Sequence, residues 1–157
     1  MNLKSLTLFL YLASQKGYGT GKYSKWIKEK DGSTSIIFKD KDWEMNDNFF
    51  GGDPFGGRTI VFYKNKPVWI MTYYGQIPKD APLETEEVYQ FLQKALLKTS
   101  LEFPLRGPKK YTQSEFIYQN SWEGKINRFQ GKESILVQNK KIYQGNYLGG
   151  LVNLRAG

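Results

Sequence analysis

The sequence predicts an α+β fold in which a helix followed by an antiparallel meander occurs twice, with the two units related by a pseudo-twofold axis. The first observation behind this prediction is an internal repeat, since residues 55–77 align without a gap to residues 129–151 at a constant offset of 74 residues. The second is that short β-rich segments surround each copy, and the third is that an apolar helical pattern precedes each group. The identical positions of the repeat are Phe55/Phe129, Gly57/Gly131, Asn65/Asn139, Lys66/Lys140, Tyr73/Tyr147 and Gly75/Gly149.

The length of the chain fits one domain. A chain of 157 residues is close to the most common domain size. Each half alone would expose sheet edges and an apolar face, so we expect halves of about 1–80 and 81–157 to share one core. The expected unit is a single domain over residues 1–157.

The first helix is expected near the start of the chain. Leu3, Leu6, Leu10 and Ala13 recur at helical spacing, and the glycines at 17 and 19 stand where a helix C-cap belongs. The apolar run is too short to cross a membrane. A short signal peptide is the alternative interpretation, and we favour a native helix.

The second helix is expected over residues 85–98. Thr85 is the expected N-cap, and Glu86 and Glu87 lie where the helix dipole favours negative charge. Phe103-Pro104 and Gly107-Pro108 then predict an extended crossover.

The remaining chain reads as strands. Asn65-Lys66 and Asn139-Lys140 lie between β-rich runs in both copies and predict tight hairpin turns. The run of lysines from Lys16 to Lys30 is interrupted by glycines and predicts a solvated loop. The expected strands are 35–38, 43–50, 59–63, 67–74, 115–122, 125–129, 134–137 and 141–148.

Two residue types are missing, and their absence excludes several kinds of chemistry. The chain has no cysteine and no histidine. Thiol nucleophiles, Ser-His-Asp triads and Cys/His zinc sites are therefore excluded, and we predict neither a metal site nor a cofactor. The absence of disulfides fits a reducing compartment, so we expect a cytoplasmic location and no membrane partner.

The net charge of +8 favours an acidic partner. The excess is almost entirely lysine and is scattered along the chain, whereas arginine is the residue that recognises phosphate and guanine with two hydrogen bonds. Non-specific nucleic-acid binding by the basic surface is therefore kept as an alternative function.

Aromatic residues supply the main candidate site. In the last strand of each copy Trp69, Met71 and Tyr73 share one face, and their repeat equivalents are Tyr143, Gly145 and Tyr147. A methionine in one copy against a glycine in the other predicts a concavity between the repeats. Two arginines are candidate anchors for an anionic or aromatic ligand or a peptide. The predicted ligand-binding residues are Phe50, Arg58, Trp69, Tyr73, Arg106, Tyr143 and Tyr147.

The two arginines are candidates for different reasons. Arg58 has Lys132 as its repeat equivalent, so two cations could face one ligand or form two surface ion pairs. Arg106 lies in an Arg-Gly-Pro turn, which leaves its side chain little freedom to lose on binding.

Several ordered motifs resemble an uncharacterised bacterial family of domains of unknown function. They are residues 47–52 (DNFFGG), Phe55-Gly56-Gly57, residues 66–71 (KPVWIM) with Tyr73-Tyr74-Gly75, Arg106-Gly107-Pro108 and residues 147–150 (YLGG). The match also reaches Phe9-Leu10, Ala13 and Tyr18-Gly19. Members of that family occur alone or behind a helix-turn-helix domain, which implies a sensor or effector-binding role. The family has no established catalytic residues. The chain departs from its pattern at Leu105, where phenylalanine is usual, and at Leu148, where histidine is frequent.

We therefore predict a small ligand-binding or partner-binding module with an aromatic cleft between the repeats, and we favour a non-enzymatic role. The first alternative is an enzyme that uses Glu44, Asp47 or Asp53 for acid and base chemistry. The sequence leaves the ligand and the oligomeric state open.

Overall fold

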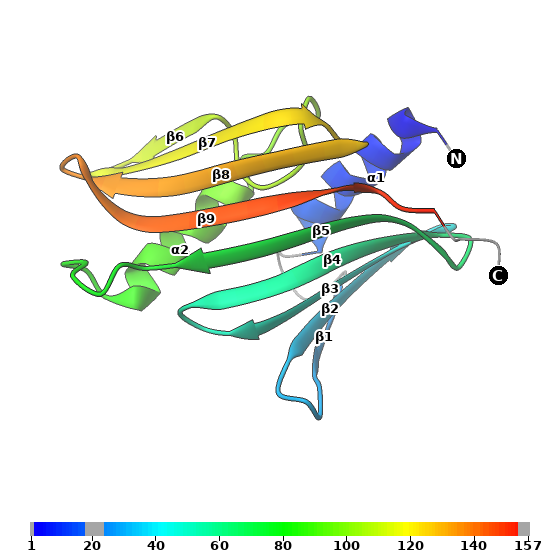
Figure 1. Ribbon diagram of the computed structural model, residues 1–157, viewed down its shortest axis with the longest axis horizontal. Helices are drawn as coiled ribbons and strands as arrows, with labels where there is room; N and C mark the ends of the chain where they lie inside the picture. Colours follow the sequence, from blue (N-terminus) through cyan, green and yellow to red (C-terminus); the bar gives the residue numbers. More distant parts are fainter. Residues whose placement is uncertain (1, 18–23, 154–157) are drawn as a thin grey trace.

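The computed structural model describes residues 2–17 and 24–153, which form one antiparallel sheet with two helices (Figure 1). The sheet has nine strands in the order β1-β2-β3-β4-β5-β9-β8-β7-β6. The α+β class is confirmed. In chain order the elements are α1 (Leu3–Lys16), β1 (Ser24–Lys28), β2 (Thr34–Asp40), β3 (Trp43–Gly51), β4 (Phe55–Tyr63), β5 (Lys66–Gln76), α2 (Thr85–Leu96), β6 (Lys110–Gln113), β7 (Phe116–Lys125), β8 (Arg128–Val137) and β9 (Lys140–Leu151).

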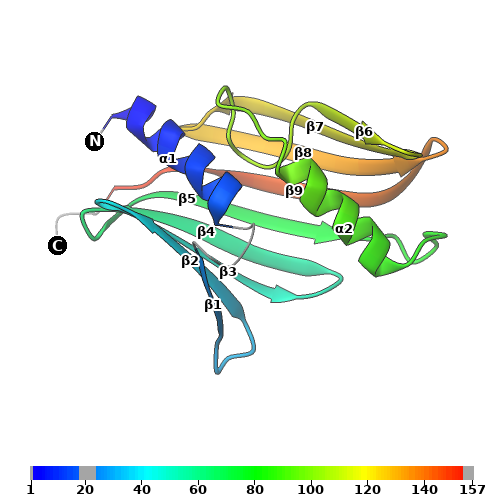
Figure 2. The ribbon, with the colours of Figure 1, turned by 180° about the vertical axis from the view of Figure 1, so that it is seen from behind.

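Both helices pack on the same face of the sheet (Figure 2). We call this the covered face. Trp69 and Met71 of β5 and Tyr147 of β9 point to it and are buried. The opposite face carries neither of the two described helices, and we call it the uncovered face. Tyr74 and Leu148 point to it and are exposed.

The helices form where the apolar spacing predicts them. The Asn2 side chain caps α1, since its Oδ1 accepts a hydrogen bond from the backbone N–H of Ser5 at 2.8 Å. Gly17 follows α1 in a right-handed conformation, and Gly19 lies outside the described residues. The predicted N-cap of α2 is wrong by one residue: Glu84 occupies that position, without a capping side-chain bond, and Thr85 is the first helical residue.

The two central hairpins use the same turn. Lys64 and Asn65 both have positive φ angles (49° and 63°), as do Gln138 and Asn139 (47° and 63°). Two consecutive positive φ values are typical of the type I′ turn, which suits the right-handed twist of paired strands. The predicted turns are therefore present, one residue earlier than Asn-Lys.

The centre of the sheet is the pair β5 and β9. Their register sets Tyr73 directly opposite Tyr147, its equivalent in the sequence repeat. The β4–β5 ladder has an irregularity between Val61 and Phe62, and the β8–β9 ladder has one between Ile135 and Leu136, which is the same place in the repeat.

Three strand predictions need correction. The segment expected as a solvated, lysine-rich loop contains β1, and the crossover after Pro108 contains the unpredicted β6. Residues 125–129 are not one strand, because the chain turns at Ile126 and Asn127 between β7 and β8. The two unpredicted strands are short edge strands, so they lack the long alternating pattern by which strands are recognised.

Each helix covers its own part of the core. Leu6 and Phe9 of α1 pack in one cluster with Phe38 and Met45. Val88, Phe91 and Ala95 of α2 pack in a second cluster, with side chains of β7, β8 and β9. The C-terminal ends of the two helices approach each other over the middle strands of the sheet (Figure 2).

Candidate functional site

The C-terminal ends of α1 and α2 meet on the covered face (Figure 2). A cavity of about 230 Å³ lies there. The amide of Gln15 joins the two helix ends, since its Nε2 donates to the backbone oxygen of Leu97 at 3.0 Å. The described lining comes from the sheet, both helices and the crossover that precedes β6. It includes Met45, Thr59, Trp69 and Met71 from the sheet, Leu10 and Ser14 from α1, Gln93 and Leu96 from α2, and Leu105 and Arg106 from the crossover.

Arg106 is the charged group of this lining. Its backbone is left-handed (φ 59°), and its side chain is 13% exposed. Nε donates to Oε1 of Glu133 at 3.1 Å, Nη2 donates to the same oxygen, and the guanidinium carbon lies 5.7 Å from the centre of the Tyr73 ring. Burial is the largest single influence and lowers the pKa of Arg106, but the charge and hydrogen bond of Glu133 together with the nearby Tyr143 and Tyr118 raise this pKa well above its ordinary value.

Glu133 organises the surroundings of Arg106. Its side chain is 1% exposed. Besides Arg106, it accepts hydrogen bonds from the hydroxyl groups of Tyr118 (2.6 Å) and Tyr143 (2.9 Å). The Tyr118 hydroxyl in turn accepts the backbone N–H of Gly107 at 2.9 Å. These bonds fix the crossover to the sheet, so the position of Arg106 is set before any ligand arrives.

Two central tyrosines make matching hydrogen bonds beside this cluster. The Tyr73 hydroxyl donates to Oδ1 of Asp47 at 2.8 Å, and the Tyr147 hydroxyl donates to Oδ1 of Asn120 at 2.7 Å. Asp47 also accepts from Thr59, a cavity residue, at 2.7 Å. The polar groups beside the cavity are thus mutually hydrogen-bonded.

The buried tyrosines are neutral donors at neutral pH. Burial, followed by the nearby Glu133 charge, raises the pKa of Tyr118, Tyr143 and Tyr147 above its ordinary value. A phenol that resists deprotonation donates hydrogen bonds and does not act as a base. This arrangement therefore orients groups and holds charge.

The predicted ligand-binding residues divide between the two faces. Trp69, Tyr73, Arg106, Tyr143 and Tyr147 belong to the covered side. Within this group Trp69 and Arg106 line the cavity, and Tyr143, which like Trp69 is fully buried, is bonded to Glu133 instead. The other two residues are elsewhere: Phe50 is half exposed at the end of β3, and Arg58 is exposed on the uncovered face.

Met71 and its repeat equivalent, Gly145, have different surroundings, because the space beside Gly145 is occupied. A methyl group added at Gly145 would meet the Tyr143 hydroxyl at 2.7 Å and Glu133 Oε1 at 2.9 Å. The glycine therefore makes room for the Arg106–Glu133 cluster, and the cavity lies over Met71 in the first half.

Sequence reasoning missed Glu133, Tyr118 and Asn120. The alternation of residues along the strand indicates the position of Glu133, because Glu133, Ile135 and Val137 lie on the same face, and Ile135 and Val137 are buried. A glutamate on the apolar face of a strand predicts a buried partner. Of the two charges in the cluster, only Arg106 is among the predicted ligand-binding residues.

The candidate catalytic carboxylates do not form a pair. Glu44 points to the uncovered face and forms an ion pair with Lys39 at 2.7 Å, whereas Asp47 is buried on the covered face. Asp53 accepts hydrogen bonds from the backbone of Ile77 and the hydroxyl of Tyr89. Residues 2–17 and 24–153 contain no group of three carboxylates placed to hold a metal ion.

The family model described as "Domain of unknown function (DUF5680)" matches residues 47–152. The chain belongs to this family. The resemblance to an uncharacterised domain family is confirmed, and the DUF5680 match includes Arg106, Glu133 and both central tyrosines. It begins within β3, so α1 precedes it.

Neither the curated proteins nor the solved structures contain a match to the chain. Neither described helix of this DUF5680 protein has the length and apolar character needed to span a membrane.

Proposed function

We propose that this protein is a small-molecule-binding module whose ligand occupies the cavity between α1 and α2. One observation carries the proposal: the described lining of a mostly apolar cavity contains one guanidinium, that of Arg106, which is fixed in place by Glu133. Concave, largely apolar sites with a few placed polar groups are typical of small-ligand binding. A sensor role in the cytoplasm is part of the same proposal.

The volume of the cavity sets the size of the ligand. Drug-sized ligands occupy roughly 300 to 1,000 Å³, and a cavity of about 150 Å³ is enough for benzene. A cavity of about 230 Å³ therefore suits a molecule of one or two rings. Met71 lines the cavity with a polarisable side chain, and the fully buried Trp69 lies in its wall.

The charges around the cavity favour a neutral ligand with a hydrogen-bond acceptor. Glu133 already balances the charge of Arg106, and the C-terminal ends of both helices place partial negative charge nearby. Among the described residues no hydrogen bond uses Nη1 of Arg106, since the bonds to Glu133 come from Nε and Nη2. A carbonyl oxygen of the ligand would accept a hydrogen bond from Nη1. A ligand with a full negative charge would be repelled by Glu133 and by the C-terminal ends of the helices.

The position of the cavity follows from a duplicated architecture, which is also part of the proposal. Tyr73 and Tyr147, which are 74 residues apart, face each other across β5 and β9. From each of these two strands, the neighbouring strands follow in reverse chain order toward the sheet edge. The two ladder irregularities fall at equivalent positions of the repeat. Two helices placed by such an axis bring their C-terminal ends together at the centre. The two halves would then enclose the ligand between them.

The experiment is a thermal-shift and calorimetric titration with indole-3-carboxaldehyde and benzamide, and with indole-3-carboxylate and benzoate as their charged analogues. We expect the neutral compounds to bind and the acids to bind more weakly. The Ser14→Phe variant fills the cavity from α1 and should abolish binding, whereas Ser100→Phe adds the same ring at an exposed position and should not. Absence of binding by all four compounds, or equal binding by the two variants, would overturn the proposal.

The carboxylate enzyme stays a hypothesis without a supporting observation. Its separated carboxylates offer no shared position for a substrate.

A further inference from the structure

We infer that the uncovered face binds single-stranded nucleic acid along a row of side chains that crosses the sheet. This site lies on the opposite side of the sheet from the cavity, and the inference does not depend on the proposed ligand. It rests on strand register, exposure, glycine placement and charge.

The row crosses six strands. Direct register partners connect it from β3 to β7: Phe50 faces Gly56, Gly56 faces Tyr74, Tyr74 faces Asn146, Asn146 faces Lys132, and Lys132 faces Ser121. Neighbouring strands lie about 4.8 Å apart, so the distance from β3 to β8 along the row is about 19 Å. A few nucleotides fit within that length.

Two aromatic side chains mark one end of the row. Phe50 and Tyr74 are 50% and 53% exposed, although large aromatic residues usually bury most of their area. Gly56 stands between them, and an added Cβ there would lie 3.1 Å from a carbon of the Tyr74 ring. The glycine lets the ring lie close to β4 while its other side stays in solvent. An exposed ring of this kind suits base stacking, which accepts any base.

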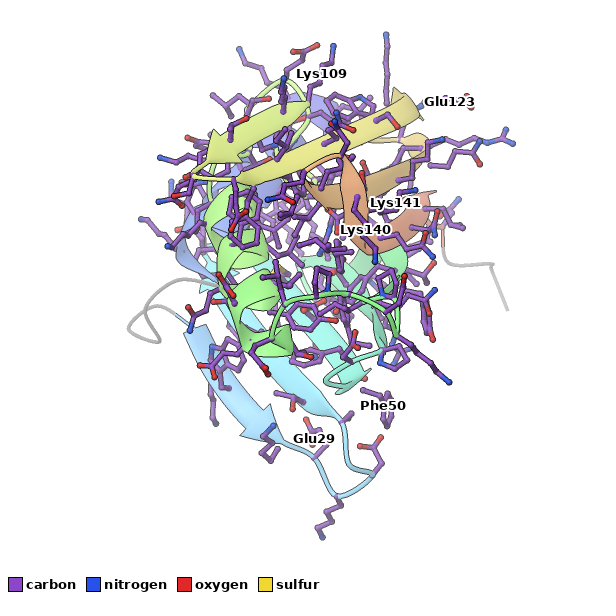
Figure 3. All side chains as sticks on the ribbon, turned by 90° about the vertical axis from the view of Figure 1, so that its left-hand side faces the viewer. Glu29, Phe50, Lys109, Glu123, Lys140 and Lys141 are labelled. Atoms are coloured by element: carbon purple, nitrogen blue, oxygen red, sulfur yellow. The ribbon has the colours of Figure 1, made fainter. Side chains whose placement is uncertain are left out.

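Lysines mark the other end. A depression of about 520 Å³ is lined by Lys109, Lys110, Lys132 and Lys141. Glu133 is the one acidic residue in the described lining, and its carboxylate is bonded to Arg106 on the covered side. Figure 3 labels Lys109, which precedes β6, near the top of the view and Lys141 of β9 near its middle, with Phe50 farther down on the uncovered side.

A central trough joins the two ends. It has a volume of about 770 Å³, and its lining includes the exposed Tyr74 and Leu148. Trp122, Tyr73, Tyr147 and several polar residues also line it. Ser121, Lys132 and Asn146 line both the trough and the lysine depression, so the two are continuous. Glu123 also lines the trough, where it accepts a hydrogen bond from Gln130 at 3.0 Å.

Amide side chains lie beside the cations. Gln119, Gln144 and Asn146 line the lysine depression, and each carries donors and an acceptor for base edges. On the β1 side of the sheet the depression around Arg58 also contains Glu29 and Asp31, so its charge is mixed. The strand of nucleic acid would therefore run from Tyr74 toward β6.

The combination selects a single strand among anionic partners. Lysines alone would hold any polyanion, including an acidic peptide, but exposed rings contribute only when unpaired bases can stack on them. In a duplex the bases are paired and stacked with one another, so Tyr74 would have no base face to contact.

Fluorescence anisotropy tests this inference. The probes are labelled RNA and DNA single strands of about 12 nucleotides and mixed sequence, a duplex of the same sequence and a polyglutamate peptide, all near physiological salt. Tyr74→Ala should weaken single-strand binding roughly tenfold, with little effect on the salt dependence. Lys132→Gln with Lys141→Gln should reduce the slope of log affinity against log salt by about 1.4 for the two lost phosphate contacts.

The matched control is Lys94→Gln with Lys98→Gln, which removes the same charge from exposed positions at α2 and beyond its end. This pair should leave binding nearly unchanged, and circular dichroism should show that all variants are folded. A difference in affinity between the RNA and the DNA single strand would identify the natural partner and support the inference. Equal effects of the two lysine pairs, no effect of Tyr74→Ala, or binding of the duplex or polyglutamate as tight as that of single strands would overturn it.

Discussion

Tyr73 and Tyr147 lie opposite each other on the two central strands, and each donates its hydroxyl to the strand two positions further out, to Asp47 of β3 and Asn120 of β7. Each ring therefore crosses the strand between, and it does so at a glycine, Gly57 or Gly131. Both glycines leave the space that a tyrosine side chain occupies.

The Gly131→Ala substitution should destabilise the fold by about 1–3 kcal/mol through overpacking. The new methyl group would collide with the Tyr147 ring, which its bond to Asn120 prevents from moving aside. Gly52→Ala is the control, because no atom lies within 4 Å of the added carbon. Urea unfolding measures both variants, and equal stability would contradict the proposed packing role.

Removal of Arg106 should be far more costly than removal of Arg58. Arg106→Met leaves the buried Glu133 without its cationic partner, which should lower the free energy of unfolding by about 3 kcal/mol or more. Arg58→Met, at an exposed site, should change it by no more than about 0.5 kcal/mol. Denaturant titration at neutral pH measures the free energy of unfolding of both variants. Equal decreases would show that the buried ion pair does not stabilise the fold more than an exposed arginine does.

Stability should fall at alkaline pH. The pKa values of Tyr89, Tyr118, Tyr143 and Tyr147 are raised in the folded state, chiefly by burial. Unfolded tyrosine has a pKa of about 10, so the stabilisation from these groups is complete below that pH and is lost as the pH rises above it. Absorbance at the tyrosinate band should show these phenols ionising only as the protein unfolds. Ionisation of all tyrosines in a single step near pH 10 without unfolding would refute this prediction.

Asn120→Asp should destabilise the protein in a pH-dependent way. Nδ2 of Asn120 donates to the backbone oxygen of Gly107 at 2.8 Å, and a carboxylate would lose that bond and bring negative charge to a buried site near Glu133. The introduced acid should have a folded pKa above its unfolded value of about 4, so the loss should grow as the pH rises from there. Asn146→Asp, at an exposed site on the uncovered face, is the control. A loss independent of pH would indicate that the charge is not the cause.

The sequence predicts the elements that carry a long, regular pattern. Both helices and the strands around Trp69 and Tyr143 fall where their apolar spacing places them, because burial of one face imposes that spacing. The edge strands β1 and β6 bury little and pair on one side only, so their residues are not constrained in this way.

The candidate site is only partly readable from the sequence. Arg106 stands out because of its Arg-Gly-Pro turn, but its partner Glu133 is 27 residues away, and their contact depends on how the crossover packs on β8. Trp69 and Tyr143 are equivalent in the repeat, yet Trp69 lines the cavity and Tyr143 does not. That difference arises from the tertiary packing of the helices, which no local pattern contains.

Both margins of the sheet end in short strands that carry lysine: Lys25 and Lys28 in β1, and Lys110 in β6. Another chain that tried to extend the sheet would have to strip water from these ammonium groups before its backbone could pair. The lysines of the two edge strands therefore oppose edge-to-edge pairing of this broad β-surface with another chain.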